Sequence, residues 1–179
     1  MRDALNRRQK SEDRGQKSDE GRGTQYAIRN TQYELSESEY IDIITEKTAA
    51  LFSSACLLGA LLAKGSEPQA RLLADFGLNV GIAFQITDDL LDITGDENKT
   101  GKTPGSDVDK NKLTLPIIHL LRTVDENRRA HCESRIASGD KAVLGEMLSR
   151  FGSLEYANSR AEEYVARAIA SLAGLKEGD

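Results

Sequence analysis

Apolar side chains recur every three or four residues along most of the chain after residue 35, which is the spacing of one face of an α-helix. The first long run predicts a helix over 37–64 that ends at Gly65. It opens on the capping box Ser36-Glu37-Ser38-Glu39, and its apolar stripe comprises Tyr40, Ile43, Ile44, Ala50 and Leu51. The second predicts a helix over 67–94, opened by Ser66-Glu67-Pro68-Gln69, a capping box with proline in the first turn.

Shorter helical patterns fill the rest of the chain after residue 112. They are TLPIIHLLR, VDENRRAHCESRI, KAVLGEMLSRFG and SLEYANSRAEEYVARAIASLAGL. Residues 95–112 are rich in Gly, Asp, Lys and Pro and are predicted to form a loop. Because no run shows sustained alternation of period two, the sequence predicts an all-α fold.

The N-terminal segment 1–23 differs from everything that follows. Apart from alanine, its apolar side chains are Met1 and Leu5, amid many charged residues and glycines. Such a segment cannot bury enough apolar surface to offset its ordering entropy, so we expect it to be disordered or ordered only against a partner. Residues 24–179 are then a single helical domain, as the length of 179 residues suggests.

Charge and composition limit the environment of the protein. The formal net charge of -5 argues against general binding to nucleic acid or to anionic membranes, which require a basic surface. The longest apolar run, 49–63, is shorter than the roughly 20 residues of a membrane span. Cys56 and Cys132 show no metal-ligand spacing, and the N-terminus lacks the apolar core of a secretory signal. The sequence predicts a soluble, cytoplasmic protein without a membrane span.

The stretch TGDENKTGKT, residues 94–103, ends like a nucleotide-binding P-loop. A P-loop needs a glycine, four residues and then Gly-Lys-Ser/Thr, so that backbone N–H groups surround a phosphate. Gly95 lies one residue too far from Gly101, and the required position holds Asp96, which would repel phosphate. The pattern also follows a predicted helix where a P-loop follows a strand, so P-loop nucleotide binding is disfavoured.

The same stretch partly matches a calcium-binding EF-hand loop. Positions 1, 3, 5, 6 and 12 of such a loop would be Asp96, Asn98, Thr100, Gly101 and Asp107. Position 9 is Pro104, and position 12 is Asp where a bidentate Glu is preferred. Calcium binding is therefore a minor alternative to a plain solvated loop.

Stronger candidate chemistry precedes this loop in GIAFQITDDLLDI, residues 81–93. On a helix Gln85, Asp88, Asp89 and Asp92 project from one face. Carboxylates on so apolar a helix are costly unless they face a wet cavity or a cation. Hard oxygen ligands without His or Cys favour Mg²⁺, which commonly bridges one or two carboxylates to a substrate phosphate. The alternative is an exposed acidic face.

Lys47-Thr48 interrupts the apolar pattern of the first predicted helix. A lysine in mid-helix is commonly a surface residue whose stem lies along apolar neighbours. If the two long helices pack antiparallel, however, Lys47 could share the acidic cavity, and Lys102 in the loop could approach it.

Several spaced motifs together resemble one known family. FQITDDLLDITGDENKTGKTPGSDVDKNKLTLPI, residues 84–117, is similar to the second aspartate-rich region of the trans-prenyltransferases, the polyprenyl diphosphate synthases. The matching pattern is FQ, two residues, DDxxD, then GK, a further Asp and TLP. Residues 39–63 resemble the KTA helix of the family, and 153–172 its C-terminal helix. The resemblance extends over residues 33–175.

The resemblance implies a fold and a reaction. The fold would be an antiparallel helix bundle of the isoprenoid synthase type, represented by its C-terminal half only. The reaction would condense an allylic diphosphate with isopentenyl diphosphate. Mg²⁺ held by Asp88, Asp89 and Asp92 would stabilise the departing diphosphate. Lys47 and Lys102 would contact that diphosphate, with Thr48 and Gln85 lining the same cavity and Lys102 joining the aspartates in the catalytic set.

The sequence also departs from the family pattern. It has no other Asp-Asp pair, so the first aspartate-rich motif is missing, and the usual GExxQ appears only as Gly21-Arg22-Gly23-Thr24-Gln25. The chain could be a fragment, one subunit of a composite enzyme, or a non-catalytic homologue that binds Mg²⁺ and diphosphate or regulates a synthase. We expect little or no chain elongation by this polypeptide alone. Helices that lack their covering half would expose apolar patches, which predicts a homodimer or a heteromer.

Overall fold

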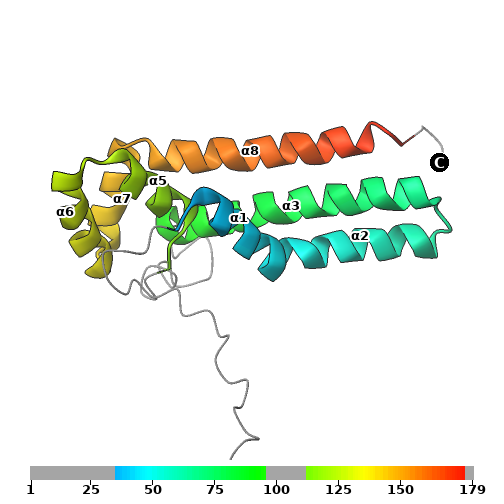
Figure 1. Cartoon of the computed structure of the whole chain (residues 1–179), viewed down its shortest axis with the longest axis horizontal. Coiled ribbons are helices and arrows are strands. Elements are labelled where there is room, and N and C mark those ends of the chain that lie inside the picture. The colour runs from blue at the N-terminus through cyan, green and yellow to red at the C-terminus, as the bar shows by residue number, and fades with distance from the viewer. Residues whose placement is uncertain (1–34, 96–111, 176–179) are drawn as a thin grey trace, which may run out of the picture.

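The computed structural model describes residues 35–95 and 112–175, and every element in these two ranges is helical. Three long helices, α2 (Ala50–Leu62), α3 (Glu67–Thr94) and α8 (Ser153–Leu172), run side by side (Figure 1). The tight turn between α2 and α3 makes them antiparallel, and α8 again runs opposite to α3. The predicted all-α fold and antiparallel bundle are confirmed.

Shorter helices cluster at one end of the long ones. They are α5 (Leu115–Thr123), α6 (Glu126–Ala137) and α7 (Lys141–Arg150), while α1 (Glu37–Ile44) crosses near the middle of the bundle (Figure 1). The segments 1–23 and 96–111 lie outside the described residues. The predicted leader, the near P-loop, the calcium-loop alternative and Lys102 therefore stay predictions.

The predicted helix starts are confirmed by their capping contacts. The Ser36 hydroxyl accepts the backbone N–H of Glu39 at 3.2 Å, and the Glu39 carboxylate accepts the backbone N–H of Ser36 at 2.8 Å. At the start of α3, Oε1 of Gln69 accepts the backbone N–H of Ser66 at 2.6 Å. These bonds satisfy backbone donors that a helix start otherwise leaves unpaired. Helix α3 has the predicted bounds.

The first predicted helix differs from expectation in the middle. A π-helical turn, η1 (Thr45–Ala49), separates α1 from α2, and the Ala50 N–H bonds the carbonyl of Thr45, five residues earlier. This extra residue shifts the helical phase. Ala49 is 0% exposed while Leu51 is 74% exposed, so the predicted placement of Ala50 and Leu51 in the buried stripe is wrong.

Two glycines on α3 allow the first helical segments to pack very closely. A side chain at Gly77 would meet the carbonyl oxygen of Phe52 at 2.5 Å, and one at Gly81 would meet Cα of Ala49 at 2.5 Å. Residues without Cβ therefore set the distance between η1–α2 and α3. The close packing brings the polar side chains of these helices within hydrogen-bonding reach.

The interior contains two clusters of buried apolar side chains. The first joins α1, α3, α5 and α8 through residues such as Tyr40, Ile86 and Leu115. The second joins the end of α3 to α5, α6 and α7 through Ile117, Leu144 and others. The candidate site on α3 adjoins the first cluster, so its side chains are held by a packed interior.

The continuous helical stretch Glu37–Leu62 is long and apolar enough to cross a membrane when judged by length and composition alone. A core helix of a soluble protein passes the same test, so this is weak evidence. The stretch is little buried, since 17% of its most apolar window lies inside the described structure. It packs against α3 on one side and leaves leucines exposed on another.

Candidate functional site

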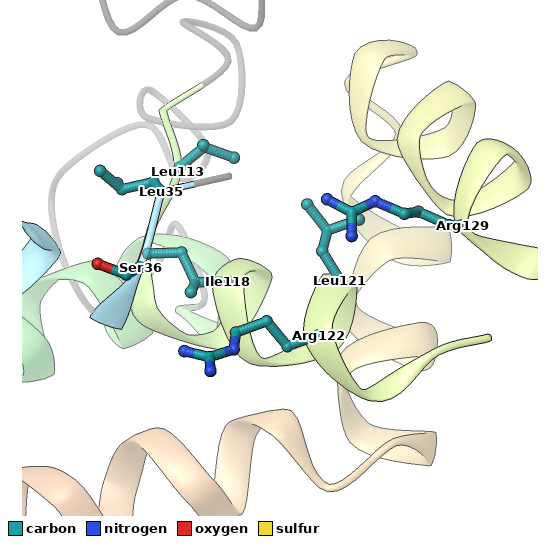
Figure 2. A pocket seen from close by; sticks show the side chains of 7 residues that line it. All are labelled: Leu35, Ser36, Leu113, Ile118, Leu121, Arg122 and Arg129. Carbon is teal, nitrogen blue, oxygen red and sulfur yellow. The ribbon is translucent and has the colours of Figure 1, made fainter. Parts of the chain in front are cut away.

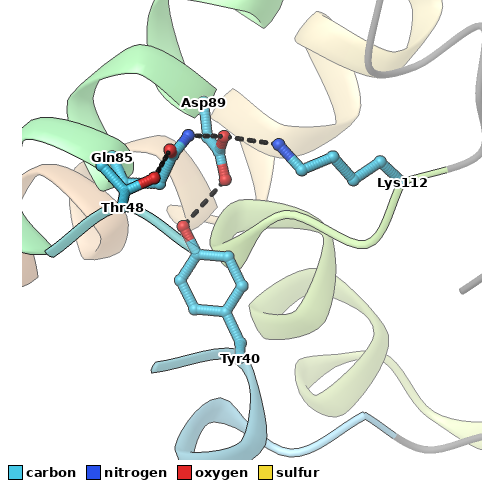
Figure 3. Close-up of polar contacts among 5 residues, drawn as sticks. All are labelled: Tyr40, Thr48, Gln85, Asp89 and Lys112. Atoms are coloured by element: carbon cyan, nitrogen blue, oxygen red, sulfur yellow. Dashed lines mark hydrogen bonds and ion pairs between the residues drawn. The ribbon is translucent and has the colours of Figure 1, made fainter. Parts of the chain in front are cut away.

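Asp89 lies at the centre of a buried polar cluster drawn in Figure 3. Its side chain is 0% exposed, although the helix around it is strongly apolar. One carboxylate oxygen accepts the hydroxyl of Tyr40 at 2.8 Å. The other accepts Nε2 of Gln85 at 2.9 Å and Nζ of Lys112 at 2.8 Å. The three donors come from α1, α3 and the segment that precedes α5.

These contacts explain how a carboxylate can remain in the interior. An isolated buried charge is very unfavourable, and a buried ion pair is tolerated when further hydrogen bonds satisfy its remaining lone pairs. Lys112 supplies the opposite charge, and its side chain is 27% exposed, so this partner reaches the surface. Tyr40 and Gln85 complete the shell. Asp89 therefore ties three segments of the fold together.

The hydrogen bonds continue from Asp89 to the π-helical turn. Thr48 donates its hydroxyl to Oε1 of Gln85 at 2.7 Å, and the same amide donates to Asp89 (Figure 3). The Gln85 side-chain amide thus accepts on one side and donates on the other. The structure brings together Thr48, Gln85 and Asp89, three of the residues predicted to line one cavity.

Asp88 and Asp92 occupy the outer part of the same helix face. Both side chains are partly buried and lie one helical turn apart, whereas Asp89 points fully inward. Within the described ranges, no three His, Cys, Asp or Glu side chains are grouped so that they could hold one ion. The predicted carboxylate set is therefore divided: one carboxylate is saturated by protein donors, and two lie nearer the surface.

The predicted lysines have different outcomes. Lys47 lies in η1 and is exposed, and its side chain makes no hydrogen bond or ion pair to a described residue. Its contact with a diphosphate stays a prediction, as does that of Lys102. Lys112, in contrast, was not singled out from the sequence, although it makes the ion pair with Asp89.

Tyr40 is the second side chain of the Asp89 cluster that the sequence analysis did not identify. It was assigned to the apolar stripe, and its ring is indeed buried at 2% exposure. A buried tyrosine usually finds a partner for its hydroxyl. That rule, applied to an apolar stripe facing a helix with three aspartates, could have predicted the Tyr40–Asp89 contact.

A separate surface pocket of about 170 Å³ lies between α5, α6 and the residues before α1. Arg122 and Arg129 line it together with Leu121, and Figure 2 shows Leu35 and Leu113 on its opposite side. Its remaining lining residues are Ser36 and Ile118. None of the predicted site residues lines this pocket, so it is distinct from the Asp89 cluster.

The polyprenyl synthetase family model matches residues 11–148, which is most of the chain. The chain belongs to the polyprenyl synthetase family. This confirms the trans-prenyltransferase resemblance, and the match begins within the polar segment 1–23.

Curated relatives support the same family. The chain is 38% identical over 149 residues to a short chain isoprenyl diphosphate synthase of Methanothermobacter thermautotrophicus, covering 82% of this chain and 46% of that protein. It is 37% identical over 139 residues to heptaprenyl diphosphate synthase component 2 of Geobacillus stearothermophilus, covering 76% of this chain and 43% of that protein.

Solved structures of the family share the arrangement of helices. The polyprenyl synthase from Caulobacter crescentus CB15, solved in complex with calcium and isoprenyl diphosphate, matches with a TM-score of 0.74 and 32% identity. The match covers 80% of this chain and 45% of that one. The chain thus spans less than half the length of the polyprenyl synthetase relatives that it matches.

Proposed function

We propose that this chain provides the metal and diphosphate side of a polyprenyl diphosphate synthase site. The whole enzyme would join an allylic diphosphate to isopentenyl diphosphate, as the relatives' names as prenyl diphosphate synthases suggest. The single observation that carries the proposal is the aspartate-bearing face of α3, built around Asp89 in a chain of this family. Mg²⁺ bound there would neutralise charge on the departing diphosphate.

The donor set suits a hard divalent ion. Mg²⁺ commonly takes one or two carboxylates and keeps waters and phosphate oxygens in its other positions. Asp88 and Asp92 are partly exposed and one turn apart, so their oxygens would be the protein ligands. Asp89 has both oxygens engaged and would contribute through its charge and through the position of Lys112.

The remaining side chains would bind and orient the diphosphate. Lys112 is partly exposed while held against Asp89, so it presents a positive charge at a fixed place. Thr48 and Gln85 form a hydrogen-bonded pair that would fix the adjoining wall of the cavity. Lys47 on η1 and Lys102 in the loop after α3 would supply further positive charge to the same diphosphate.

Calorimetric titration with inorganic diphosphate and Mg²⁺ tests this proposal. We expect binding by the parent chain and its loss in Asp88→Ala, because that substitution removes a metal ligand. Lys141→Ala on α7 is the control that keeps diphosphate binding. Unchanged binding in Asp88→Ala would show the carboxylate assignment to be wrong. A separate titration with Ca²⁺ tests the calcium-loop alternative.

We further propose that this polypeptide by itself elongates prenyl chains poorly or not at all. It spans 43–46% of the synthases compared above, and one of them is named as component 2 of a heptaprenyl diphosphate synthase. Incubation with an allylic diphosphate, radiolabelled isopentenyl diphosphate and Mg²⁺ measures its activity. Turnover comparable to that of a full-length synthase would contradict this expectation. Diphosphate binding without turnover would favour a Mg²⁺-diphosphate-binding subunit that regulates a synthase.

A partner chain is the second element of the proposal. Helix α2 exposes Leu51, Leu58 and Leu62, with exposed fractions of 74%, 58% and 84%. Large exposed apolar surfaces are characteristic of interaction sites. A second copy of this chain, or a chain with the helices that full-length relatives carry, would cover this face. Sedimentation of a compact monomer at micromolar concentration would contradict the dimer.

A further inference from the structure

A second polar cluster joins the start of α1 to α8. Its α1 residue, Glu37, lies three residues before Tyr40. The carboxylate of Glu37 accepts the hydroxyl of Tyr156 with one oxygen. Its other oxygen accepts Nε of Arg160 at 2.7 Å. The side chains of Glu37 and Arg160 are 22% and 23% exposed, so this pair is largely shielded from water. The contacts link residues more than 100 positions apart in sequence.

Helix α5 completes this second cluster. The His119 ring stacks on Tyr156 with centroids 4.2 Å apart and an interplanar angle of 19°. Nδ1 of His119 lies 3.0 Å from the hydroxyl of Ser153, which is fully buried in the first turn of α8. Burial and the hydrogen bond to Glu37 raise the pKa of Tyr156, so its hydroxyl remains a donor. Stacking fixes the ring from which that hydroxyl projects.

Glu37 and Tyr40 lie three residues apart and therefore on neighbouring positions of one helix face. Helix α1 is the first part of the continuous helical stretch Glu37–Leu62, and its N-terminal turn, the part of a helix that frays most easily, is held by tertiary contacts. Glu37 bonds the first turn of α1 to α8, and Tyr40 at the end of that turn donates its hydroxyl to Asp89. A shift of the first turn would move the Tyr40 hydroxyl relative to that carboxylate.

We propose that Glu37, Tyr156 and His119 are positioning residues for the diphosphate site. They fix α1 so that Tyr40 holds one oxygen of Asp89 and leaves the other oriented toward Lys112. This inference rests on the proposed function, because the diphosphate site is the element that is positioned. None of the three side chains contacts Asp89 directly among the described hydrogen bonds, so their influence passes through Tyr40.

The affinity of the full chain for inorganic diphosphate with Mg²⁺, measured by calorimetry, tests the inference. We expect Tyr156→Phe and Glu37→Gln each to weaken binding roughly five- to tenfold, at the low end of the coupling measured between linked sites. Two matched controls remove the same kinds of group, a tyrosine hydroxyl and a carboxylate charge, at α8 positions that make no hydrogen bond to α1. Tyr164→Phe alters another α8 tyrosine, and Glu163→Gln alters the other carboxylate bonded to Arg160. Both should bind within twofold of the parent.

A double-mutant cycle separates positioning from general stability. In a Tyr40→Phe background the route to Asp89 is already broken, so Tyr156→Phe should cause no further loss of affinity. A merely structural role would lower the melting temperature of every variant and weaken binding equally in both backgrounds. Equal, additive losses, or unchanged affinity in Tyr156→Phe, would overturn the inference.

A measurement without ligand separates failure of this inference from failure of the proposed function. The side-chain carboxyl carbon resonance of Asp89, assigned by Asp89→Asn, should move in Tyr156→Phe and in Glu37→Gln. It should stay in place in Tyr164→Phe and Glu163→Gln. If the parent binds no Mg²⁺-diphosphate, the proposed function fails and the resonance still decides the coupling. A resonance that stays in place in Tyr156→Phe would refute the coupling whatever the binding result.

Discussion

The Asp89 cluster and the outer face of α2 both depart from the usual placement of side chains. The first buries a charged group, and the second exposes apolar ones. Asp89 is charged and 0% exposed, whereas Leu62 is apolar and 84% exposed. The carboxylate has its partners within the described chain, on α1, α3 and the segment before α5. The leucine stripe of α2 is covered by none of the described residues. Among the described residues, the buried carboxylate therefore has its hydrogen-bond partners, whereas the exposed leucines of α2 have no covering side chains.

The largest effect on folding should come from breaking the Asp89–Lys112 pair. Lys112→Met would leave a buried carboxylate without its cation, and we expect the free energy of unfolding to fall by about 3 kcal/mol. Chemical denaturation at pH 7 measures it. Lys141→Met on α7 should change stability by less than about 0.5 kcal/mol.

The double variant Asp89→Asn/Lys112→Met provides an internal check on this prediction. Removing both charges leaves no uncompensated ion, so most of the lost stability should return. A double variant as unstable as Lys112→Met would mean that the loss comes from packing and that the charge pair is unimportant.

A smaller loss should follow from forcing α3 away from η1 and α2. At Gly81 a methyl group would meet Cα of Ala49 at 2.5 Å, so Gly81→Ala should destabilise the fold by about 2 kcal/mol. Thermal melting monitored by circular dichroism measures the change. Gly145→Ala on α7 has open space and should stabilise its helix by up to about 1 kcal/mol. The two substitutions should therefore shift the melting temperature in opposite directions.

Substitutions on the apolar face should barely affect the fold. Leu51→Gln, Leu58→Gln and Leu62→Gln alter exposed side chains, and each should change stability by less than about 0.5 kcal/mol. Their combination should instead weaken self-association, which sedimentation velocity measures, because the apolar contact area is lost. Unchanged association would show that this face is not the interface.

The smallest expected effect concerns the dependence of stability on pH. Burial is the main cause that lowers the pKa of His119 from its ordinary value, with Arg122 adding to it and Glu37 opposing it. The unfolded chain then binds more protons, so the contribution of His119 to stability is present above about pH 6.5 and falls as the pH drops below it. His119→Gln should flatten that part of the profile. His131→Gln, at an exposed position of α6, is the control.

The sequence predicted the parts of the fold that local patterns specify. One capping box with a proline indicated the start of α3, and the polar, Gly- and Pro-containing loop after residue 94 indicated its end. The spacing of Gln85 and Asp89 correctly placed both on one face. The family was likewise identified from motif residues on α3 and in the loop after it. These features depend on residues that are close in sequence.

Features that depend on distant residues were not predicted. Lys112 lies 23 positions after Asp89, and nothing in its neighbours signals an ion pair. Tyr40 lies 49 positions before Asp89 and matched the apolar stripe equally well. The π-helical turn was not predicted, because one extra residue in a helix leaves only a small irregularity in the spacing of apolar residues. The error at Leu51 followed from it.

The π-helical turn fixes how the two ends of this long helical stretch are rotated about their common axis. If the same residues continued as a regular α-helix, everything beyond Ala49 would be turned by about 100° relative to Tyr40. The leucines would then face another direction while Tyr40 kept its contact with Asp89. The π-helical turn thus determines the direction in which the exposed leucines of α2 face.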